Sequence, residues 1–256
     1  MTRALLMRLL RLHGGLFEIV LINVGAAFDT EPGGIGQMLS ILPQFVIDLM
    51  GDQATYASFD GLVAFGFQHP ACLAVTLGYA CVAASSPAAE LESGLTDVLL
   101  ARPVSRRHYL AVHLAHACLA ALLMSGTALL AVIVGLHLVE LPAALHWTTY
   151  VPAAVSMVTF VLAIVGLMLL SATLGRRRGP AIARILGILV VALLLDMSAQ
   201  LWPALDPVAR FGLFHWFRPI ELALDADSTW AGPAVLLGVF GVSTTAAFWR
   251  FERRDV

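Results

Sequence analysis

The sequence predicts an all-α integral membrane protein, a single transmembrane domain of six helices with short amphipathic helices at the membrane surface. The first observation is composition, because 59% of the 256 residues are hydrophobic and 12% are charged, against roughly 25% charged in a soluble domain. The second is a mean hydropathy of +0.86, carried by long apolar runs. The third is that thirteen of the fifteen basic residues fall on one side of the topology that these runs imply.

The apolar runs set the positions of the spans, because a helix needs about 20 apolar residues to cross a bilayer. The second run is interrupted only at 68–70, and the fifth carries Arg184 and Asp196 near its two ends. A β-barrel is excluded, because its strands would alternate in polarity over segments of about ten residues. One domain covering 1–256 is expected, with an interfacial elbow helix at 1–13 and spans at about 14–30, 61–85, 108–136, 150–174, 181–201 and 232–250.

The N-terminal region is the least regular part of this topology. Arg8 and Arg11 lie three residues apart and share a helical face, while leucines cover the rest of the surface. That pattern is typical of a helix lying in the membrane interface. The apolar run that follows is short and contains Glu18 and Asn23, so the ends of the first span are poorly defined. A cleaved signal peptide is the alternative, and the same two polar residues disfavour it.

The arginines orient the chain with both termini in the cytoplasm, because cytoplasmic loops carry an excess of positive charge. The outer segments hold Arg210 and Arg218. Of these segments, 38–50 is expected on the outer membrane face, and 202–231, rich in Trp, Phe and Pro, is expected to form an interfacial belt or a re-entrant turn. The cytoplasmic segments hold Arg3, Arg8, Arg11, Arg102, Arg106, Arg107, Arg176, Arg177, Arg178, Arg184, Arg250, Arg253 and Arg254.

Several classes of function lack the residues they need. The chain has no lysine, and a P-loop requires one to reach the phosphates of a nucleotide, so ATP chemistry would have to sit on another chain. The net charge of −2 gives no electrostatic case for binding nucleic acid. The sequence has no GxSxG and no HExxH motif, and we expect no catalytic residue.

Cysteine and histidine do not form a ligand pattern. Cys72, Cys81 and Cys118 lie inside apolar runs, so they are expected to be small buried hydrophobic residues without disulfides. His113 and His116 lie one turn apart near the start of the third span, but no further ligand has a matching spacing. We therefore expect a polar cluster at the membrane interface and no metal.

Charge is concentrated in one cytoplasmic loop, ELESGLTDVLLARPVSRRHYL, at 90–110. Ser86-Pro87 can open a helix there, and Pro103 disfavours helical geometry at Arg102, so the helix should end at about that point. Ser105 can cap the helix of the third span. One face of the expected loop helix carries apolar residues at helical spacing, namely Leu91, Leu95, Val98 and Leu99.

Two motifs in this chain carry a family resemblance. The loop has an acidic pair, a glycine, an apolar run and Pro-x-Ser-Arg, in the order Glu90, Glu92, Gly94, Leu99-Leu100, Pro103, Ser105 and Arg106. The chain ends in FERRDV at 251–256. The loop resembles the ABC-2 type permease family, the membrane subunits of many bacterial ATP-driven exporters, and the C-terminus is similar to its closing Phe-x-Arg-Arg-Asp-Leu. The resemblance covers essentially the whole chain.

The resemblance implies a partner and a mechanism. Two permease subunits, identical or paralogous, would pair in the lipid of the bacterial inner (cytoplasmic) membrane on two ABC ATPase subunits. ATP and Mg²⁺ would be held by the ATPase, and this chain would carry no cofactor. The loop helix would be a coupling helix that docks into a groove of the ATPase. Its interface residues would be Glu90, Glu92, Gly94, Asp97, Arg102, Pro103, Ser105 and Arg106.

Three polar residues inside spans are candidates for the transport pathway, because a polar group in the membrane is costly and by default functional. They are Asn23, Asp196 and Gln200. Alternatively, Asp196 reaches outer water, since Trp202 lies only one to two turns beyond it. The apolar spans favour export of a hydrophobic or amphipathic small molecule, such as a drug, an antibiotic or a lipid. The alternatives are a subunit serving the maturation of an extracytoplasmic metalloenzyme, and an ATP-independent membrane scaffold or enzyme.

Overall fold

The computed structural model describes residues 58–101, 103–138 and 146–253. Over these residues every regular element is helical, which confirms the all-α class. The expected elbow helix at 1–13, the first span at 14–30 and the surface segment at 38–50 lie outside the described residues. The α-helices are α6 (Phe59–Gly66), α7 (Pro70–Ala84), α8 (Ser86–Glu92), α9 (Leu95–Leu100), α10 (Arg106–Leu138), α11 (Val151–Leu174), α12 (Arg178–Leu201), α13 (Asp206–Ala209), α14 (Pro219–Leu224) and α15 (Ala231–Glu252), with single 3-10 turns η1 (Trp147–Tyr150), η2 (Pro203–Leu205) and η3 (Phe214–Trp216).

Four helices in the described part of the chain are long and apolar enough to cross a membrane. They are α10, α11 together with η1, α12 and α15, and each begins and ends within about three residues of a predicted span. A fifth candidate span consists of α7 and α8, which pass the same test together but are bent by 47°. The protein is therefore a multi-pass membrane protein with four to five candidate spans among the described residues.

The second span differs from its prediction. The span expected at 61–85, whose apolar run is interrupted at 68–70, is divided between Phe67 and His69 into α6 and α7. Pro70 begins α7, since proline lacks the N–H that would continue the hydrogen-bond ladder from α6. After Ala84 the chain turns again into α8.

The loop helix also differs from its prediction, because it is two helices rather than one. α8 and α9 are separated at Ser93-Gly94, where Gly94 adopts φ +75°. This left-handed conformation is open to glycine without steric cost, and it turns α9 away from the axis of α8. The helical spacing from Leu91 to Leu99 therefore does not define one face, and Val98 is 60% exposed.

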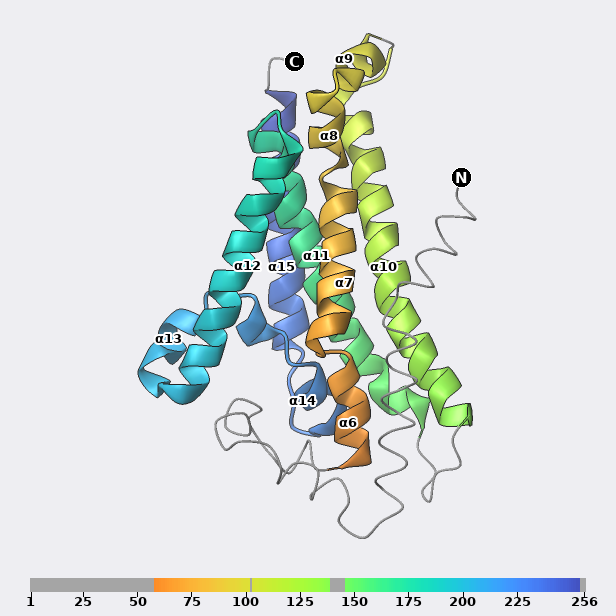
Figure 1. Ribbon diagram of the computed structural model, residues 1–256, viewed down its shortest axis with the longest axis vertical. Helices are drawn as coiled ribbons and strands as arrows, with labels where there is room; N and C mark the ends of the chain where they lie inside the picture. The colour runs from red at the N-terminus through yellow and green to blue at the C-terminus, as the bar shows by residue number, and fades with distance from the viewer. Residues whose placement is uncertain (1–57, 102, 139–145, 254–256) are drawn as a thin grey trace.

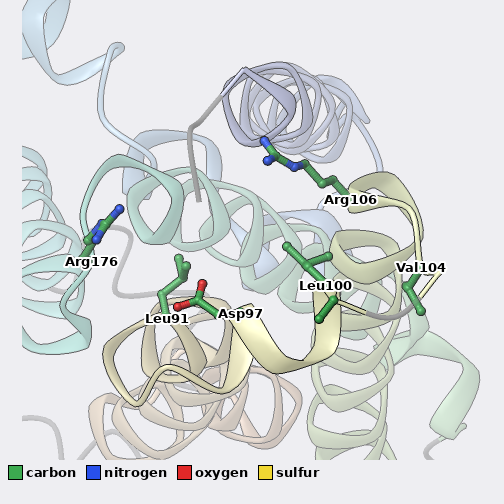
Figure 2. Close-up of a pocket in the computed structure, with 7 residues that line it drawn as sticks. Leu91, Asp97, Leu100, Val104, Arg106 and Arg176 are labelled. Carbon is green, nitrogen blue, oxygen red and sulfur yellow. The ribbon is translucent and has the colours of Figure 1, made fainter.

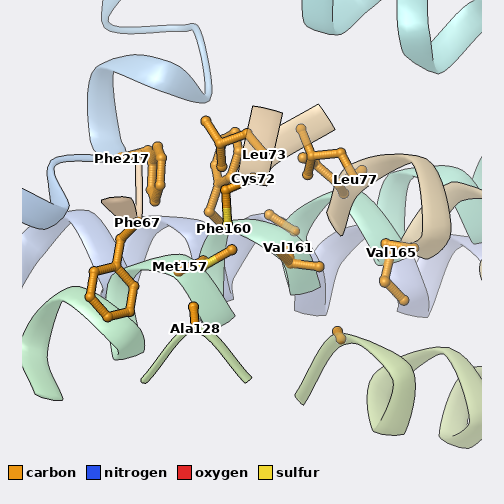
Figure 3. Close-up of a cluster of buried hydrophobic side chains, with 14 of the residues drawn as sticks. Phe67, Cys72, Leu73, Leu77, Ala128, Met157, Phe160, Val161, Val165 and Phe217 are labelled. Atoms are coloured by element: carbon orange, nitrogen blue, oxygen red, sulfur yellow. The ribbon is translucent and has the colours of Figure 1, made fainter. Parts of the chain in front are cut away.

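α11 is the central helix of the bundle (Figure 1). Of its most apolar stretch 72% is buried, against 28–44% for α10, α12 and α15, and it contacts α7, α10, α12, α14 and α15. Figure 3 shows Leu73 and Leu77 of α7 on one side of α11 and Ala128 of α10 on the other. Phe160 stacks on Phe217 with ring centroids 4.3 Å apart, and this contact fixes the segment before α14 to the core.

The close approach of α11 and α15 depends on Gly166. A Cβ atom at this position would lie 3.0 Å from the carbonyl oxygen of Phe240 and 3.2 Å from its Cα. Because these are backbone atoms of a packed helix, Gly166→Val is expected to lower the free energy of unfolding by about 1–3 kcal/mol. Thermal unfolding in detergent measures this loss. Gly187→Val in α12, where nothing lies within 4 Å of a Cβ, is the control, and an equal loss in both variants would contradict the packing argument.

Candidate functional site

Most of the charged side chains of the described residues gather at one end of the bundle, which we name the charged end. It is formed by α8, α9, the first turns of α10 and α12, and the last turn of α15 (Figure 1). Segments far apart in the sequence meet there through three sets of contacts, of which two join α8 and α9 to the long helices and the third joins two long helices to each other.

The first set centres on Glu90 in α8, whose carboxylate faces inward. Tyr109 Oη donates to Glu90 Oε2 at 2.7 Å, and His113 Nε2 lies 3.3 Å from the same oxygen. Ser86 Oγ lies 2.8 Å from His113 Nδ1, and Thr96 Oγ1 of α9 lies 3.2 Å from Tyr109 Oη. Two side chains of α10 therefore hold both short helices of the loop.

The second set joins α12 to the bend between α7 and α8. The backbone N–H of Arg178 donates to Glu92 Oε2 at 3.0 Å. The side chain of Arg178 donates from Nε to Ser85 Oγ at 2.9 Å and from Nη2 to the carbonyl of Val82 at 3.0 Å. Arg178 thus hydrogen-bonds to polar groups at the break between the two helices and ties the start of α12 to α8.

The third set joins α10 to α15. Arg107 forms an ion pair with Glu252, and Arg106 Nη1 donates to the carbonyl oxygen of Glu252 at 3.3 Å. Below them, Tyr109 stacks on Phe251 with centroids 5.6 Å apart. The exposed ion pair itself adds little stability, but the buried aromatic pair links the Glu90 cluster to the last helix.

A cleft of about 480 Å³ opens at the charged end, between α8–α9 and the long helices. Figure 2 shows Leu91 and Asp97 between Arg176 and Arg106. The cleft combines apolar side chains with charges of both signs, and Asp97 at its rim is exposed. Its lining consists of Leu91, Asp97, Leu100, Ala101, Val104, Arg106 and Arg176.

The structure separates the residues predicted at the coupling interface into three groups. Glu90, Glu92 and Arg106 contact other helices of this chain. Asp97, Pro103 and Ser105 are exposed, and Ser105 Oγ accepts the backbone N–H of His108 at 3.2 Å, which confirms it as the cap of α10. Gly94 forms the turn between α8 and α9, and Arg102 lies outside the described residues.

Asp196 is held by an ion pair that its sequence position does not reveal. Its side chain is 10% exposed, and Arg218 Nη2 lies 3.3 Å from its Oδ1. Gln200 Nε2 lies 3.5 Å from the other carboxylate oxygen, and Arg218 Nε donates to the carbonyl of His215 at 3.3 Å. The carboxylate thus neutralises an arginine from the segment before α14. Asn23, the third candidate pathway residue, lies outside the described residues.

The burial of Cys72 and Cys81 agrees with the prediction from the sequence. Cys72, Cys81 and Cys118 are all free, the first two buried and the third half-buried. In the described ranges, no group of three His, Cys, Asp or Glu side chains lies close enough to hold a metal ion. His113 belongs to the polar cluster around Glu90, whereas His116, which was expected in the same cluster, is exposed.

Long apolar helices around a buried central helix, with charge gathered at one end, define a multi-pass helical membrane protein. The chain belongs to the family described as "Multidrug efflux system permease Rv1217c, C-terminal domain", whose family model matches residues 2–252. The family indicates a transport permease rather than an enzyme. No curated protein and no solved structure matches the chain.

Proposed function

We propose that this chain is the transmembrane subunit of an ATP-driven ABC transporter of the ABC-2 type, exporting a hydrophobic or amphipathic small molecule. Two copies, or this chain and a paralogue, would pair in the bacterial inner membrane on two ATPase subunits that hold ATP and Mg²⁺. The proposed topology has six spans, an N-terminal elbow helix and both termini in the cytoplasm, so the charged end faces the ATPase. The family supports the transport role, and the absence of lysine supports a separate ATPase.

The observation that carries this proposal is the connection of α8 and α9 to three long helices. Glu90 contacts α10, Glu92 contacts α12, and Tyr109 passes the contact on to Phe251 in α15. A push on the short helices would therefore reach the transmembrane bundle without a flexible link. This is the mechanical property that a coupling element needs, because energy released on one subunit must move helices in another.

The docking surface that we propose is the exposed side of α9 with the adjoining cleft. Leu95 is 45% exposed and Val98 is 60% exposed, beside the exposed carboxylate of Asp97. Apolar side chains at the centre of a polar rim are typical of protein interfaces, and the mixed charges of Asp97, Arg106 and Arg176 around the cleft would set register and partner choice.

Co-purification tests this proposal directly. Tagged protein, expressed together with candidate ABC ATPase subunits from the same genome, is expected to retain one of them, and Val98→Asp is expected to reduce the retained amount at least about tenfold, the effect of losing an interface hot spot. Val208→Asp in α13, at a valine that is 52% exposed at the other end of the bundle, is the matched control. A tagged protein that never retains an ATPase, or full retention by Val98→Asp, would refute the docking surface.

A further inference from the structure

A second pocket, of about 410 Å³, lies at the end of the bundle opposite the charged end. It is enclosed by the start of α11, the segment from η3 to α14, and the start of α15. Its size falls within the range of about 300–1,000 Å³ that small-molecule sites occupy. The polar and aromatic side chains that line it include Ser156, His215, Trp216, Arg218, Glu221 and Asp225.

The charge of this pocket is negative. Arg218 is paired with Asp196 at 3.3 Å, and Asp196 is not part of the pocket lining. The carboxylate of Asp196 therefore largely compensates the positive charge of Arg218. Glu221 and Asp225 lie one helical turn apart on the pocket wall, and neither carboxylate is within ion-pair distance of a basic side chain among the described residues. Two carboxylates without an ion-pair partner attract a cation. Beside an apolar wall an organic cation is favoured over an inorganic one, because it loses less hydration on binding.

A buried hydroxyl independently indicates that the pocket takes a ligand. Ser156 of α11 is 1% exposed and lines the pocket, and its Oγ has no hydrogen-bond partner among the described residues. Such an unsatisfied buried group destabilises the folded protein, and a polar group of a bound molecule would remove that cost. The indole of Trp216 is fixed by a hydrogen bond from Nε1 to the carbonyl of Arg210 at 2.8 Å, and a fixed aromatic ring is a further binding element for a cation.

From this combination we infer that the pocket binds a cationic amphiphile, with its charged group at Glu221 and Asp225 and its apolar body against Trp216. The role of this binding in export rests on the proposed permease function. In the proposed orientation the pocket lies on the side where an exporter releases its cargo. The binding itself needs neither an ATPase nor ATP.

Tetraphenylphosphonium is a suitable probe, because it is a permanent cation with an apolar body. Purified full-length protein in lipid nanodiscs is expected to bind it saturably, and E221Q/D225N is expected to weaken that binding at least tenfold while thermal unfolding stays unchanged. Asp227→Asn, a carboxylate in the same segment outside the pocket lining, is the matched control and is expected to bind like the wild type. Neutral triphenylphosphine oxide is expected to bind the wild type and E221Q/D225N equally.

Ser156→Leu provides a second test that does not depend on charge. A leucine side chain projecting into the pocket is expected to weaken tetraphenylphosphonium binding severalfold. The inference is wrong if the wild type shows no saturable binding, or if either E221Q/D225N or Ser156→Leu binds tetraphenylphosphonium as the wild type does. These outcomes are independent of the proposed function, whose failure would appear as absence of a co-purifying ATPase with tetraphenylphosphonium binding intact.

Discussion

Replacement of Glu90 by alanine is expected to lower transport at least tenfold while the ATPase remains bound. Glu90 accepts the hydroxyl of Tyr109 at 2.7 Å and lies against His113 at 3.3 Å, so it holds α8 on α10. Its carboxylate contacts α10, and Glu90 is not among the residues that line the cleft of the proposed docking surface. Alanine would remove the link between that surface and α10, and it would leave the buried Tyr109 hydroxyl with Thr96 as its remaining partner.

The measurement is transport of a fluorescent substrate in vesicles, normalised to the amount of ATPase that co-purifies. Glu90→Gln keeps an oxygen that can accept the Tyr109 hydroxyl and is expected to restore most of the transport that Glu90→Ala loses. Ser93→Ala, which removes a hydroxyl from the exposed turn beside Glu90, is the control and is expected to transport normally. If Glu90→Ala instead loses the ATPase, the residue belongs to the docking surface, and its assignment as a positioning residue is wrong.

The long helices could be predicted from the sequence because their signal is local. A run of about 20 apolar residues specifies a membrane helix without reference to any other part of the chain. The helices α10, α11, α12 and α15 accordingly begin and end close to the predicted spans. The break between α6 and α7 has a local signal too, since Pro70 stands at the first position of α7.

The loop between α7 and α10 could be predicted only in part. Its helical content and its cap at Ser105 follow from neighbouring residues, but its spacing of leucines favoured one helix, whereas Gly94 ends α8 and begins α9 in the left-handed conformation. A glycine in the middle of a short amphipathic run was the available signal. The spacing of the leucines favours one helix because it is a pattern over several residues, whereas the turn depends on the single residue Gly94.

The inward direction of Glu90 and the pairing of Asp196 could not be predicted, because both depend on residues from other elements. Glu90 meets Tyr109 and His113 across the turn that leads into α10, and Asp196 meets Arg218, which is 22 residues away. An intramembrane carboxylate indicates a function by default until an ion-pair partner within the fold is found. The structure supplies that partner and favours a structural role for Asp196 over contact with the transported molecule.

Asp196→Ala is therefore expected to destabilise the protein by about 2 kcal/mol. Breaking a fully buried ion pair costs about 3–5 kcal/mol, because the remaining charge stays buried without its partner. Here the cost is smaller, since a third of the Arg218 side chain is exposed and water screens it. Unfolding by denaturant in mixed micelles measures this loss, and Asp206→Ala is the control because its carboxylate pairs with Arg210 at 2.7 Å on the surface, where the loss should stay below about 0.5 kcal/mol.

A double substitution separates a structural role from a role in the pathway. Asp196→Leu with Arg218→Leu removes both charges together, and its loss of stability is expected to be well below the sum of the two single losses. At equal amounts of folded protein, this double variant should also transport a neutral substrate at a rate close to the wild type if Asp196 serves only to neutralise Arg218. A double variant that folds as well as the wild type but no longer transports would contradict the structural role and assign Asp196 to the transport pathway. The loss of transport could then not be attributed to the fold.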